Sequence, residues 1–279
     1  MSPGTNHPFH VRRTGSGTPP LVLVHGFGAS GDFWRRWIPE LARHREVHAL
    51  DLKGFGRSPT PQGADYSPLA QAAHLADYLR NLGGPPPVLF GHSLGAGIAV
   101  AAALRLLDWG GAQLPAGLVL ISGAVYPQRL PPFLRLAQLP LVGDLFLLAP
   151  PPRFALRLGI RGIVHRSSPV TREMVEVYRK PLQSLRRRRT ILRAARQVAA
   201  ADAEPVSSRL GEIPIPTLLL WGTDDRVVPP ELGRRLERDL PHAHLIELPR
   251  VGHLPPEEAP EASLAPVLTF LADRVDGES

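Results

Sequence analysis

The sequence contains no cysteine, and this absence excludes disulfides, thiolate metal sites and cysteine nucleophiles. It also lacks a long apolar run. The most apolar interior stretch, residues 139–152, is interrupted by Gly143 and Asp144 and ends in three prolines, short of the ~20 residues that span a bilayer. Residues 1–13 are polar and broken by proline and glycine, whereas a secretory signal needs a continuous apolar segment. We therefore expect a cytoplasmic protein without membrane insertion.

The positive charge of the chain is not accompanied by a nucleic-acid-binding motif. Lys and Arg number 32 against 25 Asp and Glu, which gives a formal net charge of +7 and would permit an acidic partner. Most of these charges are arginines scattered through a chain rich in Ala, Leu and Pro. We expect a small-molecule substrate and no nucleic acid, and the sequence predicts no particular oligomeric state.

Short apolar runs bounded by turn residues recur along the chain and are predicted strands. Their continuous apolar character is typical of strands that are covered on both faces. Helix-like segments such as 69–82 and 95–107 alternate with them, which predicts an α/β fold with a mostly parallel central sheet and helices on both faces. The predicted strands begin at Leu21, Glu46, Pro87, Gly117, Pro216 and Ala243.

The alternation of strands and helices breaks between about residues 124 and 205, a Pro- and Arg-rich segment, and resumes at Pro214. The 279 residues with 43% hydrophobic content suit one large domain, or a domain with one insertion. We therefore expect one core in two parts, residues 1–123 and 206–279, with a helical insertion at 124–205.

The stretch GHSLG places Ser93 between a predicted strand and a predicted helix, with Gly91 and Gly95 on either side. This pattern is typical of a nucleophile elbow, in which a sharp turn strains the serine backbone and its neighbours must be small. The Leu94 N–H would then lie at a helix N-terminus, free to face a developing negative charge. The alternative is a serine that only caps the helix, with incidental glycines.

A nucleophilic serine needs a histidine base that a carboxylate orients. Among 11 histidines, His253 lies in a Gly- and Pro-containing loop after the last predicted strand, although a surface histidine is the alternative. We interpret the others, including His92 of the elbow, as structural, packing or solvated residues. Asp224 and Asp225 follow the preceding strand, and only one of them can orient the base. The chain order is thus Ser, Asp, His, the order of α/β-hydrolases.

Several separated motifs together resemble the α/β-hydrolase superfamily. They are HGFGAS at His25, DLKGFGRS at Asp51, GHSLG, and the C-terminal pair WGTDDRVVP and VGHLPPEEAP. The group they resemble includes carboxylesterases, meta-cleavage product hydrolases and cofactor-free haloperoxidases. The resemblance implies that Asp225 is the acid, and that the Phe27 N–H is the second oxyanion donor beside Leu94. A tight Gly-rich turn without a ligand is the alternative for HGFGAS.

The resemblance also implies that residues 124–205 form a helical cap over the active site. We expect some of its apolar residues to line a pocket and most to pack on the core. Trp34 and Trp37 are open to the same two interpretations. The four arginines at 186–189 are expected on the solvated outer face of a cap helix. The motif at Asp51 is read as architecture. The apolar cap residues are Phe133, Leu134, Leu136, Leu139, Leu141, Leu145, Phe146, Leu147 and Leu148.

Taken together, these features predict a serine hydrolase that cleaves a carboxylic ester, or a related acyl bond, of a small and largely apolar substrate. Ser93, Asp225 and His253 would be the catalytic residues, and no metal or organic cofactor is expected. Family members that hydrolyse haloalkanes or epoxides place aspartate where this chain has Ser93. Hydrolysis of a C–C bond, perhydrolysis and a ligand receptor without turnover remain alternatives.

Overall fold

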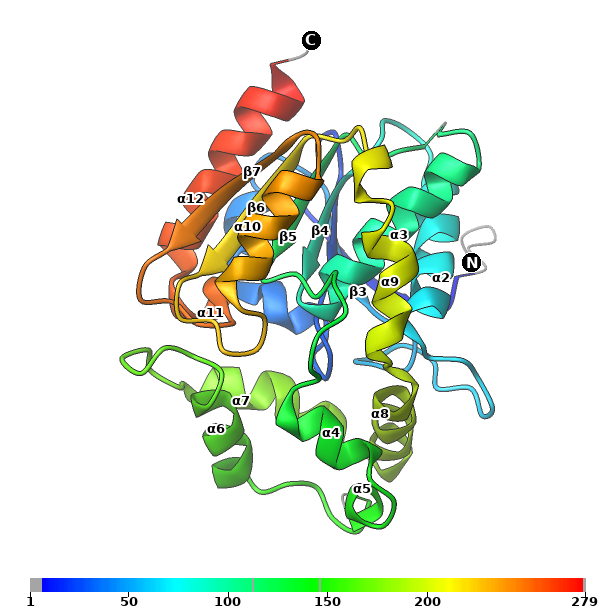
Figure 1. The fold of residues 1–279 in the computed structure, drawn as a ribbon, viewed down its shortest axis with the longest axis vertical. Helices are drawn as coiled ribbons and strands as arrows, with labels where there is room; N and C mark the ends of the chain where they lie inside the picture. The colour runs from blue at the N-terminus through cyan, green and yellow to red at the C-terminus, as the bar shows by residue number, and fades with distance from the viewer. Residues whose placement is uncertain (1–6, 112, 146, 278–279) are drawn as a thin grey trace.

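The computed structural model describes residues 7–277 except residues 112 and 146, and its strands form one seven-stranded sheet (Figure 1). The strand order is β1-β3-β2-β4-β5-β6-β7, and every neighbouring pair is parallel except β1 and β3. The predicted mostly parallel α/β sheet is therefore confirmed. The strands are β1 (His10–Thr14), β2 (Leu21–Val24), β3 (Val47–Asp51), β4 (Val88–His92), β5 (Gly117–Ile121), β6 (Thr217–Gly222) and β7 (Ala243–Leu248).

The two edge strands differ from the sequence-based expectation. Strand β1 was not predicted, because its sequence HVRRT is polar and its side chains are half-buried or exposed. It owes its place to antiparallel pairing with β3, in which Val11 lies opposite Leu50. Strand β7 was expected to be covered on both faces, but as the other edge its residues before Leu248 are half-buried or exposed.

Alternate residues of the central strands feed two separate apolar clusters, one on each face of the sheet. On β2, Val22 and Val24 belong to the cluster under α2, α3 and α10, whereas Leu21 and Leu23 belong to the cluster with η1 and α12. Burial of both faces explains the continuous apolar runs. The core helices are η1 (Gly31–Arg36), α1 (Ile38–Leu41), α2 (Pro68–Arg80), α3 (Leu94–Asp108), η4 (Leu210–Glu212), α10 (Pro230–Asp239), α11 (Pro255–Glu258), α12 (Pro260–Phe270) and the π-helical η5 (Leu271–Asp276).

Only helices and loops occur in the described residues between β5 and β6, and we call residues 124–205 the cap segment. Helices α4 to α8 form a layer beyond the ends of the parallel strands, below the sheet in Figure 1. None of the described helices is long and apolar enough to span a bilayer. The helices of the cap segment are α4 (Pro132–Gln138), α5 (Val142–Leu145), α6 (Arg153–Arg161), α7 (Arg172–Arg179), η2 (Pro181–Gln183), α8 (Leu185–Gln197) and η3 (Ala200–Ala203); α9 (Glu204–Ser207) begins at its end.

Trp34 and Trp37 pack inside the core. Both are fully buried in the cluster that includes Phe90, and the rings of Trp34 and Phe90 meet edge to face at 6.4 Å. Neither lines the large cavity described below. Of their two interpretations, packing is therefore the correct one.

Candidate active site

Ser93 lies at the sharp turn between β4 and α3, with φ 53° and ψ −120°. This left-handed backbone region is costly for a non-glycine residue. A Cβ at Gly91 would lie 2.5 Å from the Ala96 Cα, and a Cβ at Gly95 would lie 2.5 Å from the carbonyl oxygens of Val24 and His25. The two glycines are thus required by close backbone approach, as the elbow pattern predicts.

The structure brings Ser93, His253 and Asp225 together from three separate loops. His253 Nε2 lies 3.0 Å from Ser93 Oγ, and His253 Nδ1 lies 2.9 Å from Asp225 Oδ2. The other carboxylate oxygen of Asp225 accepts hydrogen bonds from the N–H groups of Val227 and Val228 at 2.8 and 3.0 Å. A carboxylate so placed fixes the imidazole with Nε2 toward the serine.

Asp224 lies outside this arrangement. Its side chain is exposed, and Oδ2 accepts a hydrogen bond from the Thr223 hydroxyl at 2.9 Å. For Asp225, burial alone would raise the pKa of the carboxyl. The charge of His253 and the hydrogen bonds from His253, Val228 and Val227 outweigh burial and lower this pKa below its ordinary value. Asp225 is therefore ionised at neutral pH.

His92 holds the backbone of His253. Its Nε2 donates a hydrogen bond to the His253 carbonyl oxygen at 2.8 Å, and its ring stacks on Phe33 with centroids 4.4 Å apart. Burial, together with the neighbouring His253, lowers the pKa of His92 to about 3. His92 is a buried, neutral structural group, in keeping with its interpretation from the sequence.

The low pKa of His92 predicts acid lability. The unfolded chain binds a proton at this side chain near pH 6.5, whereas the folded protein binds it only near pH 3. His92 alone should therefore lower the free energy of unfolding by up to about 1.4 kcal/mol per pH unit as the pH falls from 6.5 toward 3. Urea unfolding followed by circular dichroism across this range measures the slope.

A His92→Asn variant should show a shallower slope, because asparagine keeps an N–H donor and does not titrate. His244 is exposed at the edge strand β7, so His244→Asn is the matched control and should leave the slope unchanged. An unaltered slope in the His92 variant would contradict this assignment.

Glu258 is a site residue that the sequence analysis missed. Its Oε1 accepts from the Leu254 N–H at 2.9 Å and its Oε2 from the Gly252 N–H at 3.0 Å, one on each side of His253. The same Oε2 accepts from the His165 N–H at 2.7 Å and from the Ser168 hydroxyl at 2.8 Å, both in the cap segment. One carboxylate thus ties the His253 loop to the cap.

A direct backbone contact reinforces this tie, since the His253 N–H donates to the Ile163 carbonyl oxygen of the cap segment at 2.9 Å. The only local signal for Glu258 was the paired glutamates of VGHLPPEEAP, five residues after His253. Nothing in that stretch shows which groups its carboxylate reaches, because two of them, the His165 N–H and the Ser168 hydroxyl, lie in the cap segment.

A cavity of about 480 Å³ extends from Ser93 and His253 into the cap segment. Phe133, Leu134 and Leu136 line it, as expected of some apolar cap residues. Leu139, Leu141, Leu145 and Leu148 neither line the cavity nor pack on the core but are exposed, so the expectation of packing is wrong for them. Leu147 is half-buried, and Phe146 lies outside the described residues.

The described residues that line the cavity include no Lys, Arg, Asp or Glu, and the polar side chains among them are His92, Ser93, Gln128, Tyr178 and His253. Among the residues that the structure describes, no group of three His, Asp or Glu side chains could hold a metal ion. The cavity therefore suits an apolar molecule whose reacting group reaches Ser93.

Phe27 and Leu94, the expected oxyanion donors, line the same cavity as Ser93. Leu94 is the first residue of α3, where backbone N–H groups have no partner within the helix. The loop of Phe27 is held by His25, whose Nδ1–H donates to the Gly26 carbonyl oxygen at 2.7 Å while Nε2 accepts from the Leu52 N–H at 3.0 Å. The structure thus places both residues beside the serine.

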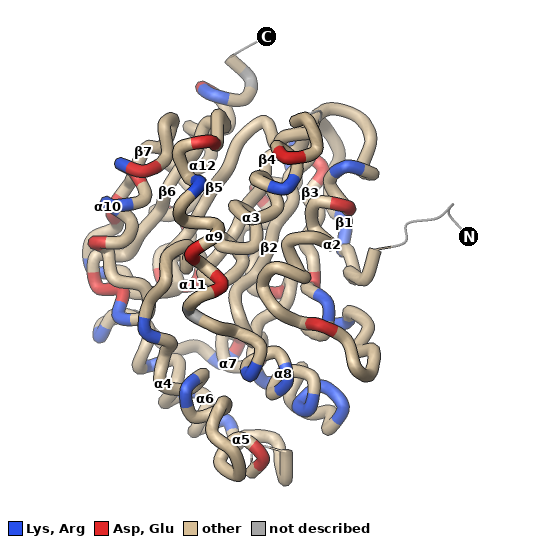
Figure 2. The backbone as a smooth tube through the Cα atoms, turned by 45° about the vertical axis from the view of Figure 1, so that its right-hand side comes forward, with Lys and Arg blue, Asp and Glu red and all other residues tan. Residues whose placement is uncertain are grey.

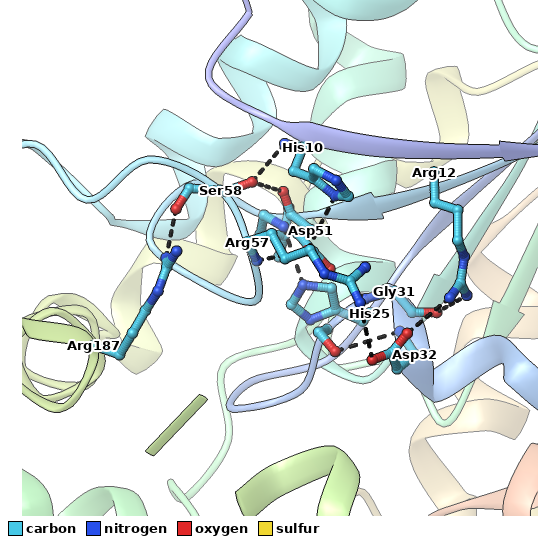
Figure 3. A network of polar contacts seen from close by, with 11 residues as sticks. His10, Arg12, His25, Gly31, Asp32, Asp51, Arg57, Ser58 and Arg187 are labelled. Atoms are coloured by element: carbon cyan, nitrogen blue, oxygen red, sulfur yellow. Dashed lines mark hydrogen bonds and ion pairs between the residues drawn. The ribbon is translucent and has the colours of Figure 1, made fainter. Parts of the chain in front are cut away.

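The motif at Asp51 is a hydrogen-bonded hub that fixes the neighbouring loops (Figure 3). The Asp51 carboxylate accepts from the N–H groups of Gly31 at 2.6 Å and Arg57 at 2.7 Å. The Ser58 hydroxyl donates to the Asp51 carbonyl oxygen and accepts from the His10 N–H at 2.7 Å. The architectural interpretation of this motif is confirmed.

The arginines at 186–189 do not all face solvent. Arg187 reaches from α8 to the Ser58 carbonyl oxygen (Figure 3), and Arg188 is buried, donating to the Leu182 carbonyl oxygen at 2.8 Å. The predicted solvated face is therefore wrong for these two residues, which fasten the cap segment. It is correct for Arg189, whereas Arg186 is exposed but also donates to the Thr60 carbonyl oxygen at 3.3 Å.

Comparisons with known proteins agree with the fold and the site geometry. The profile of the alpha/beta hydrolase family matches residues 21–266. An uncharacterized hydrolase of Bacillus subtilis strain 168, YugF, is 32% identical over 91% of this chain and 90% of its own length. A 2-hydroxy-6-oxononadienedioate/2-hydroxy-6-oxononatrienedioate hydrolase of Burkholderia vietnamiensis is 30% identical over 96% of this chain and 92% of its own.

Among solved structures, a thermophilic esterase from Thermogutta terrifontis superposes with a TM-score of 0.76 at 28% identity, covering 95% of this chain and 93% of its own. The family profile spans β2 to α12, and so includes the turn of Ser93 and the loops of Asp225 and His253. The chain belongs to the alpha/beta hydrolase family.

Proposed function

We propose that the protein is a serine hydrolase that cleaves a carboxylic ester of a small, largely apolar substrate through an acyl-enzyme on Ser93. The observation that carries this proposal is the relay from Asp225 through His253 to Ser93, with distances of 2.9 and 3.0 Å, at the inner end of an apolar cavity. This geometry supports nucleophilic attack on a carbonyl carbon. The reaction needs no metal or organic cofactor.

In the first half of the reaction, His253 takes the proton of the Ser93 hydroxyl as Oγ attacks the ester carbonyl carbon. The N–H groups of Phe27 and Leu94 stabilise the resulting oxyanion, and the charge of Asp225 stabilises the protonated imidazole. When the tetrahedral intermediate collapses, His253 gives its proton to the departing alkoxide. An ester of Ser93 and a free alcohol result.

In the second half, water attacks the acyl-enzyme while His253 takes one of its protons. The intermediate collapses, the proton returns to Ser93 Oγ, and the carboxylic acid leaves. Because the same imidazole accepts and donates a proton in each half, its hydrogen bond to Asp225 must persist throughout.

Hydrolysis of a C–C bond is the second candidate, favoured by the 30% identical relative named for that chemistry. That relative is named for a dioate, a substrate with two carboxylates. The described lining of this cavity contains no Lys or Arg to pair with a carboxylate, and burial of an unpaired charge is costly. The lining therefore favours an uncharged ester over a dioate as the substrate. Cytoplasmic location stays a separate prediction.

The proposal is tested with p-nitrophenyl acetate, butyrate and octanoate. We expect saturable hydrolysis of at least one ester, with an acyl-length preference that reports the depth of the cavity beneath the cap segment. Absence of turnover on all three, together with cleavage of a dienone acid, would transfer the assignment to C–C hydrolysis. A protein that binds esters and releases no nitrophenol would instead be a receptor.

We expect Glu258→Gln to lower kcat by about ten- to one hundredfold, because a neutral amide holds the Gly252 and Leu254 N–H groups less strongly than a carboxylate. KM should change less, since Glu258 does not line the cavity. Steady-state kinetics on the preferred ester measure both. The exposed Glu261→Gln is the matched control, and equal kcat values in the two variants would contradict a positioning role.

A further inference from the structure

The positive charge of the protein is concentrated in the cap segment. The expectation that it is scattered along the chain is therefore wrong. Residues 124–205 contain 15 Lys and Arg and five Asp and Glu, a formal charge of +10. The rest of the chain contains 17 and 20, a formal charge of −3. Figure 2 shows basic residues along α6 and α8 and mixed signs over the core. The cap segment therefore attracts anionic surfaces that the core repels.

Large apolar side chains are exposed on the same segment. Leu141 and Leu148 are 79% exposed, and Phe154, Leu158 and Leu145 are 73, 72 and 64% exposed. These residues belong to α5, α6 and the loops beside them, at the end of the molecule farthest from the sheet in both views (Figures 1 and 2). We call these five residues the docking face. Large apolar side chains exposed at one end of a molecule are typical of an interaction site.

Helix α6 shows that this exposure is a property of one helix face. Ala155, Leu156 and Gly159 line the cavity and Ile160 is buried, so the inward face of α6 is already apolar. Phe154 and Leu158, four residues apart, lie together on the opposite, exposed side. Packing against the rest of the protein therefore does not account for them.

Unpaired basic side chains accompany the docking face. Arg157 is exposed on α6 and Arg135 is exposed on α4, and neither guanidinium forms an ion pair with any residue that the structure describes. Exposed arginines beside exposed Leu and Phe are the composition of helices that lie in a membrane interface. In such helices, the apolar side chains enter the acyl region of the bilayer while the arginines contact lipid phosphates.

The cavity reaches this end of the molecule. Phe133 and Leu136 of α4 and Val142 of α5 line the cavity, yet each is about half exposed. They connect the inner apolar surface to the outer one, next to the docking face. An apolar molecule that enters past these side chains meets a lining that is mostly apolar.

We propose that the docking face binds the surface of an anionic phospholipid bilayer, as a peripheral contact and not an insertion across it. A second copy of this chain is disfavoured as the occupant, because two cap segments of +10 each would repel. The bilayer matches both the apolar and the cationic character. A corollary, which rests on the proposed function, is that acyl substrate enters the cavity from the bilayer.

The test is co-sedimentation of the full-length protein with vesicles of phosphatidylcholine alone, or of phosphatidylcholine and phosphatidylglycerol in equal parts. We expect binding to the anionic vesicles that weakens with added salt, and much weaker binding to the neutral ones. The double variant Phe154→Ser/Leu158→Ser should bind the anionic vesicles at least about tenfold more weakly, and Arg157→Gln about fivefold more weakly.

Two variants on the core serve as matched controls. Leu69→Ser removes an exposed leucine of α2 and Arg238→Gln removes an exposed arginine of α10, and both should bind vesicles like the wild type. No binding to anionic vesicles, or equal binding by the double variant and the wild type, overturns the proposal. So does a wild-type dimer in sedimentation velocity that the double variant dissociates, since it assigns the face to a second copy.

An acidic protein as partner is tested with soluble polyglutamate. Binding to polyglutamate with none to vesicles overturns the lipid proposal, whereas weak polyglutamate binding that does not respond to the double variant supports it. Hydrolysis of a soluble short ester is measured on every variant and should match the wild type, because Phe154, Arg157 and Leu158 do not line the cavity. Vesicle binding without ester turnover would therefore remove the proposed function and leave the docking face intact.

Discussion

Replacing Ser93 with alanine should lower kcat/KM on the preferred p-nitrophenyl ester by about 10⁴- to 10⁶-fold. The change removes the only oxygen within hydrogen-bond distance of His253 Nε2, 3.0 Å away, among the contacts that the structure describes. The oxyanion donors and the cavity remain, so a small residual rate above water is expected. Initial rates of nitrophenol release measure the loss.

The alanine variant should fold, because removal of one hydroxyl leaves the backbone turn to be held by Gly91 and Gly95. Ser122 offers a matched control, since it is also a buried serine with positive φ directly after a parallel strand. Its hydroxyl has no hydrogen-bond partner among the residues that the structure describes, so Ser122→Ala should keep wild-type activity. Comparable losses in both variants would point to a disturbed sheet and away from a nucleophile.

The residues around Ser93 were predictable from sequence because local geometry dictates them. Only glycine fits beside the turn, because a Cβ there would come within 2.5 Å of backbone atoms. The spacing of Gly91 and Gly95 therefore predicts the sharp turn at Ser93. The strands were predictable because burial on both faces demands continuous apolar runs. The glycine spacing and the apolar runs each lie within a few residues of the turn or strand that they predict.

Features that depend on distant contacts were not predictable in the same way. Strand β1 is polar and exists through its pairing with β3, and Glu258 matters through groups in the cap segment that lie 90 and 93 residues away in sequence. Arg188 is buried because its guanidinium donates a hydrogen bond to the Leu182 carbonyl oxygen in the preceding turn. The exposure of Phe154 and Leu158 depends on which side of α6 faces the cavity, because periodicity alone does not decide it.

The second large effect should come from Asp225→Asn, with a fall in kcat of about 10⁴-fold. The asparagine Oδ1 can still accept hydrogen bonds from the N–H groups of Val227 and Val228, so the loop after β6 should keep its shape. The amide that replaces Oδ2, however, is a donor, and it favours the imidazole tautomer with the proton on Nε2. His253 then cannot accept the Ser93 proton, and the negative charge that stabilised the imidazolium is lost.

Asp224→Asn is the control that separates this role from general electrostatics. The two aspartates are adjacent and carry the same charge, but only Asp225 contacts His253, whereas Asp224 bonds to Thr223 and faces solvent. Asp224→Asn should therefore change kcat by less than about threefold, the size of a screened surface charge effect. If the losses were instead equal, the field at the strand ends would matter more than the orientation of the imidazole. A large loss confined to Asp224→Asn would contradict the assignment and identify Asp224, not Asp225, as the orienting acid.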